Sequence, residues 1–379
     1  MSAVQEDTTC NWLCTGDEVF PSMLEAIDAA RTSVRLETYI YAADALGQRF
    51  RDALARACER GVSVKVLVDG LGSLAVPAEF WAPLQACGGE VRVFNPVVLR
   101  RMSIRNHRKL LVCDDHTAYV GGFNISTKYE GDGVRCGWCD LGLKMKGPLA
   151  VRLAASFDEM FDRAAFRHKP FMRLRRFNAK RAVPGRAEQI LLSGPGRGRS
   201  PIKRALTKDI AQARDVKIIA AYFLPTWALR RALARVVRRG GRVQLILAGK
   251  SDVVVSQLAG RSLYRRFLNA GVEIFEYQPQ ILHAKLIIVD DVVYIGSANL
   301  DQRSLQINYE LMIRFDSPEI SEQARAAFAN NLNHSQAITL EEWRKTRTLW
   351  RRIKQRWAYF LLVRVDPFIA RWQWRTLPD

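Results

Sequence analysis

The chain has 379 residues, of which 48% are hydrophobic, and carries a formal net charge of +20 at pH 7. This length predicts two domains rather than a single core, and no apolar stretch approaches the ~18 to 20 residues that a membrane-spanning helix needs. The seven cysteines are odd in number and scattered, which argues against a disulfide framework and for a reducing compartment. The first residues lack the basic and apolar regions of a secretory signal.

Two cysteine pairs have spacings that zinc sites use, Cys10 with Cys14 and Cys136 with Cys139. We favour separate reduced thiols, because the second pair lies in a segment that another motif explains. The glycine-rich run at 193–199 has the composition of a phosphate-binding loop, but no clear strand-to-helix junction surrounds it. We expect no metal and no other cofactor.

The predicted elements follow the same order in both halves of the chain. Each half reads strand, helix, strand, helix, strand and then a strand that carries the pattern H-x-K. The clearest segments are the helix at 50–60 and the strands at 61–68 and 89–94 in the first half, and the helix at 228–239 and the strands at 241–247 and 271–276 in the second. This repeat predicts an α/β chain with two homologous lobes, each a mixed β-sheet flanked by helices.

The segment between the repeats is rich in Arg, Gly and Pro and loses apolar periodicity. We therefore expect a first repeat over residues 1–165, a basic linker over 166–200 and a second repeat over 201–335. The remaining segment, 336–379, is aromatic and basic.

Both halves carry the pattern H-x-K-x4-D, followed by a short apolar run and a Gly-Gly/Ser-x-Asn box. The pattern comprises His107, Lys109, Asp114 and Asn124 in the first half, and His283, Lys285, Asp290 and Asn299 in the second. A five-position pattern that occurs twice with matching flanks is improbable by chance. We therefore expect each copy to supply half of one site at the lobe interface.

An imidazole beside an ammonium group is suited to attack on a phosphate and to neutralisation of its charge. One of the two imidazoles would attack phosphorus in line and become a phosphohistidine. The second would give its proton to the departing alkoxide and later take one from the incoming alcohol or water. The lysines and the asparagines of the boxes would donate to the non-bridging oxygens. Two inversions predict overall retention at phosphorus.

Asp114 and Asp290 are included among the catalytic candidates because they belong to the H-x-K-x4-D motif. In a regular strand, however, they project to the face opposite His107 and Lys109, and each begins an Asp-Asp pair suited to a turn. We therefore interpret them as supports of the strand ends rather than proton carriers.

Two segments interleave aromatic rings with cations. Residues 343–375 carry many Trp, Phe, Lys and Arg residues, and residues 163–186 carry Lys and Arg without an acid. Such composition suits an anionic membrane surface, where rings sit at headgroup level and cations meet lipid charge, but it also suits nucleic acid. A helix that docks its rings on the core and a solvated linker face are the alternatives.

The duplicated motif with its boxes resembles the phospholipase D superfamily over residues 17–328. The whole-chain pattern is most similar to bacterial cardiolipin synthases of the short type. The segments that carry this resemblance are 37–41, 67–73, 138–140 with 147–148, 299–304 and 308–310. The resemblance implies a metal-independent enzyme whose two repeats build one site.

By the same resemblance, His107 is the nucleophile and His283 the general acid and base. It further implies that Glu310 orients His107 and that Asp140 orients His283. The chain departs from symmetry at the boxes, where Gly122 stands opposite Ser297. A hydroxyl contact is therefore expected in one half only.

The function that these observations favour is transfer of a phosphatidyl group from phosphatidylglycerol or a related donor to a second phospholipid, which forms cardiolipin. We expect a protein that lies on an anionic membrane surface, at the cytoplasmic face of a bacterial inner membrane. The alternative is a phospholipase D-type phosphodiesterase or nuclease, in which water replaces the alcohol and nucleic acid is the less favoured substrate. A catalytically silent membrane scaffold is disfavoured, because both histidines, lysines and asparagines are intact.

Overall fold

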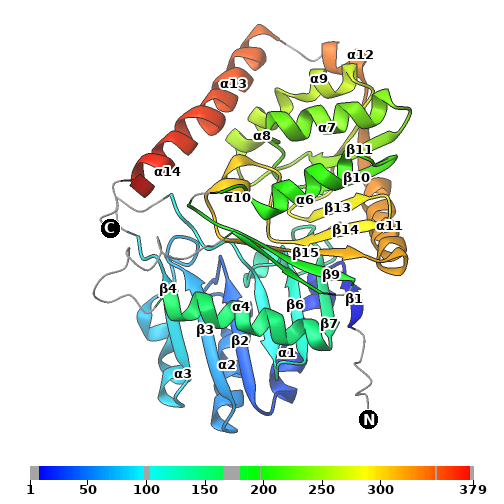
Figure 1. Ribbon diagram of the computed structural model, residues 1–379. Coiled ribbons are helices and arrows are strands. Elements are labelled where there is room, and N and C mark those ends of the chain that lie inside the picture. The colour runs from blue at the N-terminus through cyan, green and yellow to red at the C-terminus, as the bar shows by residue number, and fades with distance from the viewer. Residues whose placement is uncertain are drawn as a thin grey trace.

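A computed structural model describes residues 8–97, 103–164, 180–185, 187–196, 198–345 and 348–375. It has two α/β lobes, one built from the first half of the chain and one from the second, with the C-terminal helices along one side (Figure 1). The fold class predicted from the repeat is therefore confirmed.

The first lobe contains a seven-stranded sheet in the order β1-β7-β6-β5-β2-β3-β4. Its strands are β1 (Thr9–Leu13), β2 (Ser33–Thr38), β3 (Ser63–Asp69), β4 (Glu90–Phe94), β5 (Leu110–Cys113), β6 (Thr117–Gly121) and β7 (Gly142–Lys146). β2, β3 and β4 are parallel, and the remaining pairs are antiparallel. Its helices are α1 (Gly16–Ala29), α2 (Ala45–Glu59), α3 (Ala82–Ala86) and α4 (Pro148–Ala164), with short 3₁₀ turns at Ala78–Trp81 and Thr127–Tyr129.

The second lobe repeats this plan in a nine-stranded sheet of order β16-β12-β11-β10-β13-β14-β15-β9-β8. Its strands are β8 (Arg181–Pro184), β9 (Glu188–Ser193), β10 (Asp215–Ala220), β11 (Arg242–Ala248), β12 (Glu273–Tyr277), β13 (Lys285–Val289), β14 (Val292–Gly296), β15 (Glu310–Asp316) and β16 (Ser335–Ile338). The parallel set β10-β11-β12 corresponds to β2-β3-β4. The helices are α6 (Pro201–Ile210), α7 (Trp227–Arg238), α8 (Val254–Arg261), α9 (Tyr264–Asn269), α10 (Gln302–Gln306) and α11 (Pro318–Asn333).

Part of the segment predicted as a linker is instead sheet. β8 and β9 both lie within 166–200, and β9 pairs with β15 in the second sheet. The sequence hides these strands because they are short and flanked by Arg, Gly and Pro. Residues 165–179 and 186 lie outside the described residues, and so does most of the basic segment 163–186.

The two lobes share one apolar core. Leu153 and Phe157 of α4 and Phe328 of α11 are buried in a cluster that includes strands of both sheets. The outer face of the first sheet packs on α1, α2 and α3, and that of the second on α6, α7 and α9. This part of the lobe interface is therefore packed like a domain interior, and burial of this kind is the main force that holds the halves together.

Backbone hydrogen bonds also join the lobes where the motifs lie. His107 N donates to Tyr309 O (2.9 Å), and His283 N donates to Cys139 O (2.7 Å). Because these segments pair with the opposite lobe, the regular ladder begins only afterwards, at Leu110 in β5 and at Lys285 in β13. The histidines therefore precede the strands in which the sequence places them.

The C-terminal segment forms α12 (Leu340–Lys345), α13 (Leu349–Phe360), a π-helical turn (Leu361–Val365) and α14 (Asp366–Arg375). α13 packs against α8, and α13 and α14 run from the outer end of the second lobe toward the first (Figure 1). No helix in the part of the chain that the structure describes is both long enough and apolar enough to cross a bilayer.

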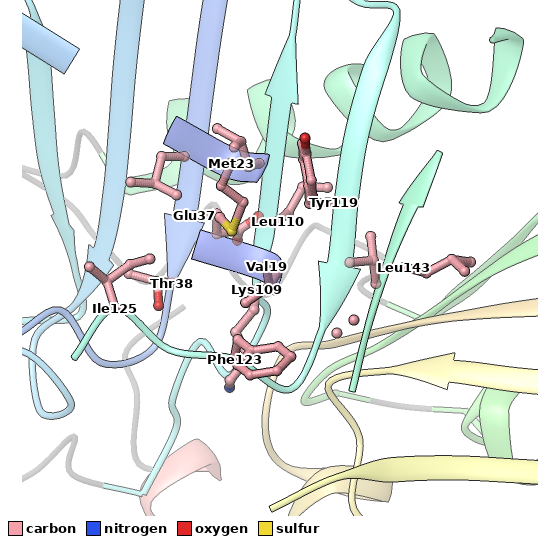
Figure 2. Close-up of a pocket in the computed structure, with 15 residues that line it drawn as sticks. Val19, Met23, Glu37, Thr38, Lys109, Leu110, Tyr119, Phe123, Ile125 and Leu143 are labelled. Carbon is pink, nitrogen blue, oxygen red and sulfur yellow. The ribbon is translucent and has the colours of Figure 1, made fainter. Parts of the chain in front are cut away.

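A small cavity of about 30 Å³ lies inside the first lobe, between α1 and the sheet (Figure 2). Apolar side chains such as Val19, Met23 and Leu143 line most of it. Two charged residues, Glu37 and Lys109, also border it. The first motif lysine therefore runs through the interior of its lobe.

Candidate active site

The two motifs meet at one pocket of about 440 Å³ between the lobes. The segments that follow the parallel strands β2, β3, β10 and β11 line it, as expected for ligand sites at the carboxyl ends of parallel strands. The lining includes both motif histidines and both box asparagines. The two sequence patterns, 176 positions apart by the numbers of their histidines (283 minus 107), thus contribute to a single site.

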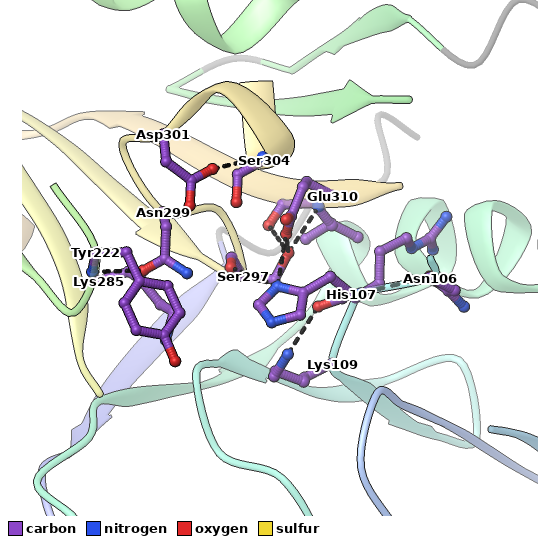
Figure 3. Close-up of polar contacts among 12 residues, drawn as sticks. Asn106, His107, Lys109, Tyr222, Lys285, Ser297, Asn299, Asp301, Ser304 and Glu310 are labelled. Atoms are coloured by element: carbon purple, nitrogen blue, oxygen red, sulfur yellow. Dashed lines mark hydrogen bonds and ion pairs between the residues drawn. The ribbon is translucent and has the colours of Figure 1, made fainter. Parts of the chain in front are cut away.

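His107 is held by a carboxylate of the other lobe (Figure 3). Its Nδ1 lies 3.1 Å from Oε2 of Glu310 and 3.1 Å from the carbonyl oxygen of Ser297. Burial tends to raise the pKa of Glu310, but the charges of His107 and Lys109 outweigh it and the pKa falls. An ionised carboxylate only accepts hydrogen bonds, so Nδ1 carries the proton and the lone pair of Nε2 is left for a substrate.

His283 is likewise held by a carboxylate of the opposite lobe. Its Nδ1 lies 2.6 Å from Oδ2 of Asp140, which the first lobe supplies. Burial and the charge of Lys285 lower the pKa of His283 to about 4, although Asp140 opposes the shift. Burial likewise lowers the pKa of His107, against the opposing effect of Glu310. In the free protein, both imidazoles are therefore neutral at pH 7.

The Gly-Gly/Ser-x-Asn boxes differ between the lobes because the carboxylate beside each box leaves a different amount of room for a side chain. Ser297 Oγ donates to Oε2 of Glu310 at 2.5 Å. At Gly122, a Cβ atom would lie 2.0 Å from Oδ1 of Asp140, so the first lobe has no room for a side chain. The hydroxyl contact expected in one half only is thus present in the second lobe.

The motif lysines lie beside the backbone of their histidines. Lys109 Nζ donates to His107 O at 2.8 Å, and Lys285 Nζ donates to His283 O and lies 3.1 Å from Nε2 of the same ring. Neither lysine lines the pocket. Burial and the charge of Lys285 lower the pKa of Lys109 to about 7. Lys285 Nζ thus lies beside the ring of His283, and the donation of the two lysines to phosphate oxygens stays a prediction.

The asparagines and several rings complete the walls. Asn124 Oδ1 accepts from the backbone N of Ile40 and Asn124 Nδ2 donates to Tyr129, while Asn299 Oδ1 accepts from the backbone N of Tyr222. Aromatic rings lie against both imidazoles: Tyr39 at 4.9 Å from His107, and Tyr129 and Trp138 at 5.4 and 5.8 Å from His283 between ring centroids. Sequence reasoning assigned these rings no part in the site, because single aromatic residues carry no motif spacing.

The motif aspartates lie elsewhere. Asp114 has φ of 56° and accepts from the backbone N of Arg31, Thr32 and Ser33, and Asp290 has φ of 51° and accepts from the backbone N of Arg214 and Asp215. Neither lines the pocket. Each ties a turn at the far end of its strand to the neighbouring strand, which agrees with the interpretation of these aspartates as supports of the strand ends.

Comparison with known proteins agrees with this arrangement. A family described as cardiolipin synthase, PLD-like domain, matches residues 23–162 and 206–332, one match in each lobe. The chain belongs to this family. Cardiolipin synthase 1 of Bacillus anthracis is 32% identical over 96% of this chain and 73% of that protein. The major cardiolipin synthase ClsA of Bacillus subtilis (strain 168) is 33% identical over 92% of this chain and 74% of that protein.

Solved structures share the fold at low identity. The crystal structure of phosphatidylserine synthase from Haemophilus influenzae Rd KW20 matches with a TM-score of 0.75 at 16% identity, over 95% of this chain and 94% of that chain. The crystal structure of a polyphosphate kinase from Porphyromonas gingivalis matches with a TM-score of 0.60 at 15% identity. That match covers 96% of this chain and 54% of the kinase chain. These likenesses support the two-lobed fold of the cardiolipin synthase family member described here.

The C-terminal segment of this family member also reaches the pocket. Leu362, Val363 and Asp366 line it, and Asp366 forms an ion pair with Arg303 at 2.6 Å. The sequence patterns ended near residue 328, so they carried no signal for this contribution.

We predict that Asp140→Asn lowers kcat by about 10²- to 10⁴-fold and moves the alkaline limb of its pH profile to lower pH. Asp140 raises the pKa of His283, so its loss leaves the imidazolium deprotonated at a lower pH. Headgroup release measured across pH tests this. Glu310→Gln is the matched control and should move the acidic limb instead; an unmoved alkaline limb in Asp140→Asn would contradict the assignment.

We also predict that Gly122→Ala lowers kcat by about 10²-fold or more, because the new methyl group displaces Asp140 from His283. Ser297→Ala is the control: it removes the contact with Glu310 without adding volume and should cost less. Both variants are compared by kcat and by thermal unfolding. Wild-type turnover in Gly122→Ala would show that Asp140 tolerates displacement.

Proposed function

We propose that this protein is a phosphatidyltransferase that forms cardiolipin from phosphatidylglycerol, or a related phospholipid donor, and a phospholipid acceptor. The observation that carries the proposal is the pair of buried imidazoles, each held through Nδ1 by a carboxylate of the opposite lobe, in one pocket of a cardiolipin synthase family member. The names of its relatives, cardiolipin synthases 32 and 33% identical, support the substrate class.

In the proposed reaction, Nε2 of His107 attacks the donor phosphorus, and the bond from phosphorus to the headgroup oxygen breaks. The imidazolium of His283 gives its proton to that oxygen, so the headgroup leaves as a neutral alcohol. The acceptor hydroxyl then gives its proton to Nε2 of His283 and attacks phosphorus as the bond to His107 breaks. Two inversions leave the configuration at phosphorus retained.

The electrostatics fit this division of labour. Burial lowers the pKa of His107, which keeps the nucleophile unprotonated. The pKa of His283, lowered to about 4 by burial and Lys285, must rise before it can act as an acid. The phosphate of a bound donor adds a negative charge beside the ring, which raises the pKa of His283 in the complex. Substrate binding and protonation of the acid are thereby coupled.

The pocket walls favour a lipid over nucleic acid. Ile40, Leu71 and Leu224 line it together with tyrosines. Its acids, Asp252, Asp301 and Asp366, outnumber its arginines, Arg105 and Arg303. A groove for a polyanion would be lined by cations and extended along the backbone. We therefore assign the positive charge of the chain to contacts of its outer surface rather than to the pocket. The apolar walls of the pocket limit access of water to the phosphohistidine.

A membrane surface fits the exposed face of the C-terminal helices. Trp350, Trp357 and Phe368 are 73, 68 and 68% exposed. Trp350 and Trp357 are seven residues apart, which places them on one side of α13, and Phe368 belongs to α14. The opposite side of α13 is docked, because Gln355 and Ala358 are buried there. The alternative of a docked helix thus describes one side of α13, and the exposed rings leave the other side for the proposed membrane contact. Exposed Val253 and Val254 at the start of α8 adjoin the pocket, and Val253 lines it. We propose that this face lies on the cytoplasmic leaflet.

Incubation with labelled phosphatidylglycerol vesicles tests the reaction. The wild-type protein should release glycerol and form cardiolipin, and should leave DNA intact in a parallel sample. His107→Ala should form no cardiolipin. Cleavage of DNA without lipid turnover would support the nuclease alternative instead.

The covalent step is tested with a phosphodiester whose leaving group needs no proton, such as phosphatidyl-p-nitrophenol. His283→Ala should release p-nitrophenolate in a burst and hold a phosphatidyl adduct on the peptide that contains His107, because the acceptor is no longer deprotonated. His107→Ala is the control without an adduct. An adduct on any other residue would refute the assigned nucleophile.

Membrane binding is tested by substitution of exposed rings. Trp350→Ser with Trp357→Ser should weaken binding to phosphatidylglycerol vesicles about tenfold or more, since two large apolar side chains no longer leave water. Trp227→Ser on α7, where the ring is 56% exposed, is the matched control and should bind as the wild type does. Equal binding of all three proteins would exclude the C-terminal face.

A further inference from the structure

The proposed acceptor carries a phosphodiester of its own. While its hydroxyl attacks the phosphohistidine, this second phosphate stands a short alcohol chain away from the first. The pocket must then hold two anionic groups, of which the histidines and motif lysines serve one. A second cation near the same pocket is needed to bind the other.

Besides the histidines, the cations that line the pocket among the described residues are Arg105 and Arg303. Arg105 is 2% exposed and forms an ion pair with Asp69 (3.3 Å), which is itself fully buried. This arginine belongs to the wall. Arg303 has a side chain that is 33% exposed, and Arg303 Nη1 contacts Asp366 Oδ1 of α14 at 2.6 Å. Arg303 is therefore the cation that an incoming ligand can reach.

Arg303 is also close to the reacting centre. It stands at the start of α10, four residues after Asn299 of the second box. It lines the same pocket as Tyr39 and His107, whose rings lie 4.9 Å apart between centroids. An anion on Arg303 would thus lie in the pocket that holds the nucleophile rather than at a remote surface.

Arg303 has two partners, of which one is poorly satisfied. Arg303 Nη2 donates to Ser103 O at 2.8 Å, and Arg303 Nη1 to the carboxylate of Asp366. Asp366 Oδ1 bonds to the guanidinium, but Asp366 Oδ2 is buried and has no hydrogen-bond partner. Burial raises the pKa of Asp366 in spite of the nearby arginine. A carboxylate held in this way is easily replaced by a group that offers two oxygens to a guanidinium, as a phosphodiester does.

We propose that Arg303 binds the phosphate of the acceptor phospholipid, and that Asp366 occupies this anion site until the acceptor displaces it. The inference rests on the proposed transfer between two phospholipids and adds the residue that recognises the second one. It distinguishes a phospholipid acceptor from a simple alcohol, which has no phosphate to offer. It also places α14, the helix that carries Asp366, at the position where the acceptor would bind.

Competition between two acceptors tests this assignment. The protein is given phosphatidyl-p-nitrophenol as donor, with phosphatidylglycerol and ethanol together as acceptors. The ratio of cardiolipin to phosphatidylethanol then reports acceptor recognition, whatever the rate of the first step. Arg303→Gln should lower this ratio about tenfold or more through loss of a charged hydrogen-bond pair. Arg303→Lys should retain part of it, and Asp366→Asn should raise it.

The opposite signs separate recognition from a structural role. If the ion pair only fixes α14, Arg303→Gln and Asp366→Asn both loosen the helix and change the ratio in the same direction, which would overturn the inference. An unchanged ratio in both variants would overturn it as well. Release of p-nitrophenolate shows that each variant retains a folded site. A wild-type protein that forms phosphatidylethanol but no cardiolipin would instead refute the proposed function, and the phospholipid acceptor with it.

Discussion

The crossed pairing of imidazoles and carboxylates is the constraint on which the arrangement of the lobes depends. Each histidine comes from one repeat and its carboxylate from the other, over sequence separations of 203 and 143 residues. Carboxylates that are completely buried, as Glu310 and Asp140 are, must be paired to remain ionised. Separation of the lobes would therefore break both imidazole–carboxylate pairs, besides exposing the shared core. The site and the interface are stabilised by the same contacts.

This constraint reaches the backbone around the site. The segments before β5 and β13 pair with the opposite lobe instead of extending their own strands. That pairing fixes the position of each Nδ1 relative to its carboxylate, and the rings of Tyr39, Tyr129 and Trp138 restrict the imidazoles from the side. Apolar side chains of the second lobe and the C-terminal segment, Val253, Leu362 and Val363, add to the lining of the pocket so formed.

The sequence predicted those features that repeat or that carry a motif. The lobes, their mixed sheets and the order of their elements followed from periodicity around His107 and His283. Strands β8 and β9 did not, since four to six residues flanked by Arg and Gly carry little periodicity. The position of Lys109 beside a cavity inside its lobe is a feature that motif spacing does not reveal. Composition left α13 ambiguous for a physical reason, because one side of the helix is docked and the other is exposed.

The difference between Gly122 and Ser297 has a consequence for why both repeats lie on one chain. In a symmetric dimer of a single repeat, the two histidines necessarily have the same neighbouring residues. When both repeats lie on one chain, the residues around each histidine can differ. One imidazole can then sit against a short acid packed on glycine, and the other against a longer acid steadied by a hydroxyl. Two chemically equal rings thereby acquire unequal surroundings, which a reaction with a dedicated attacker and a dedicated proton carrier can exploit.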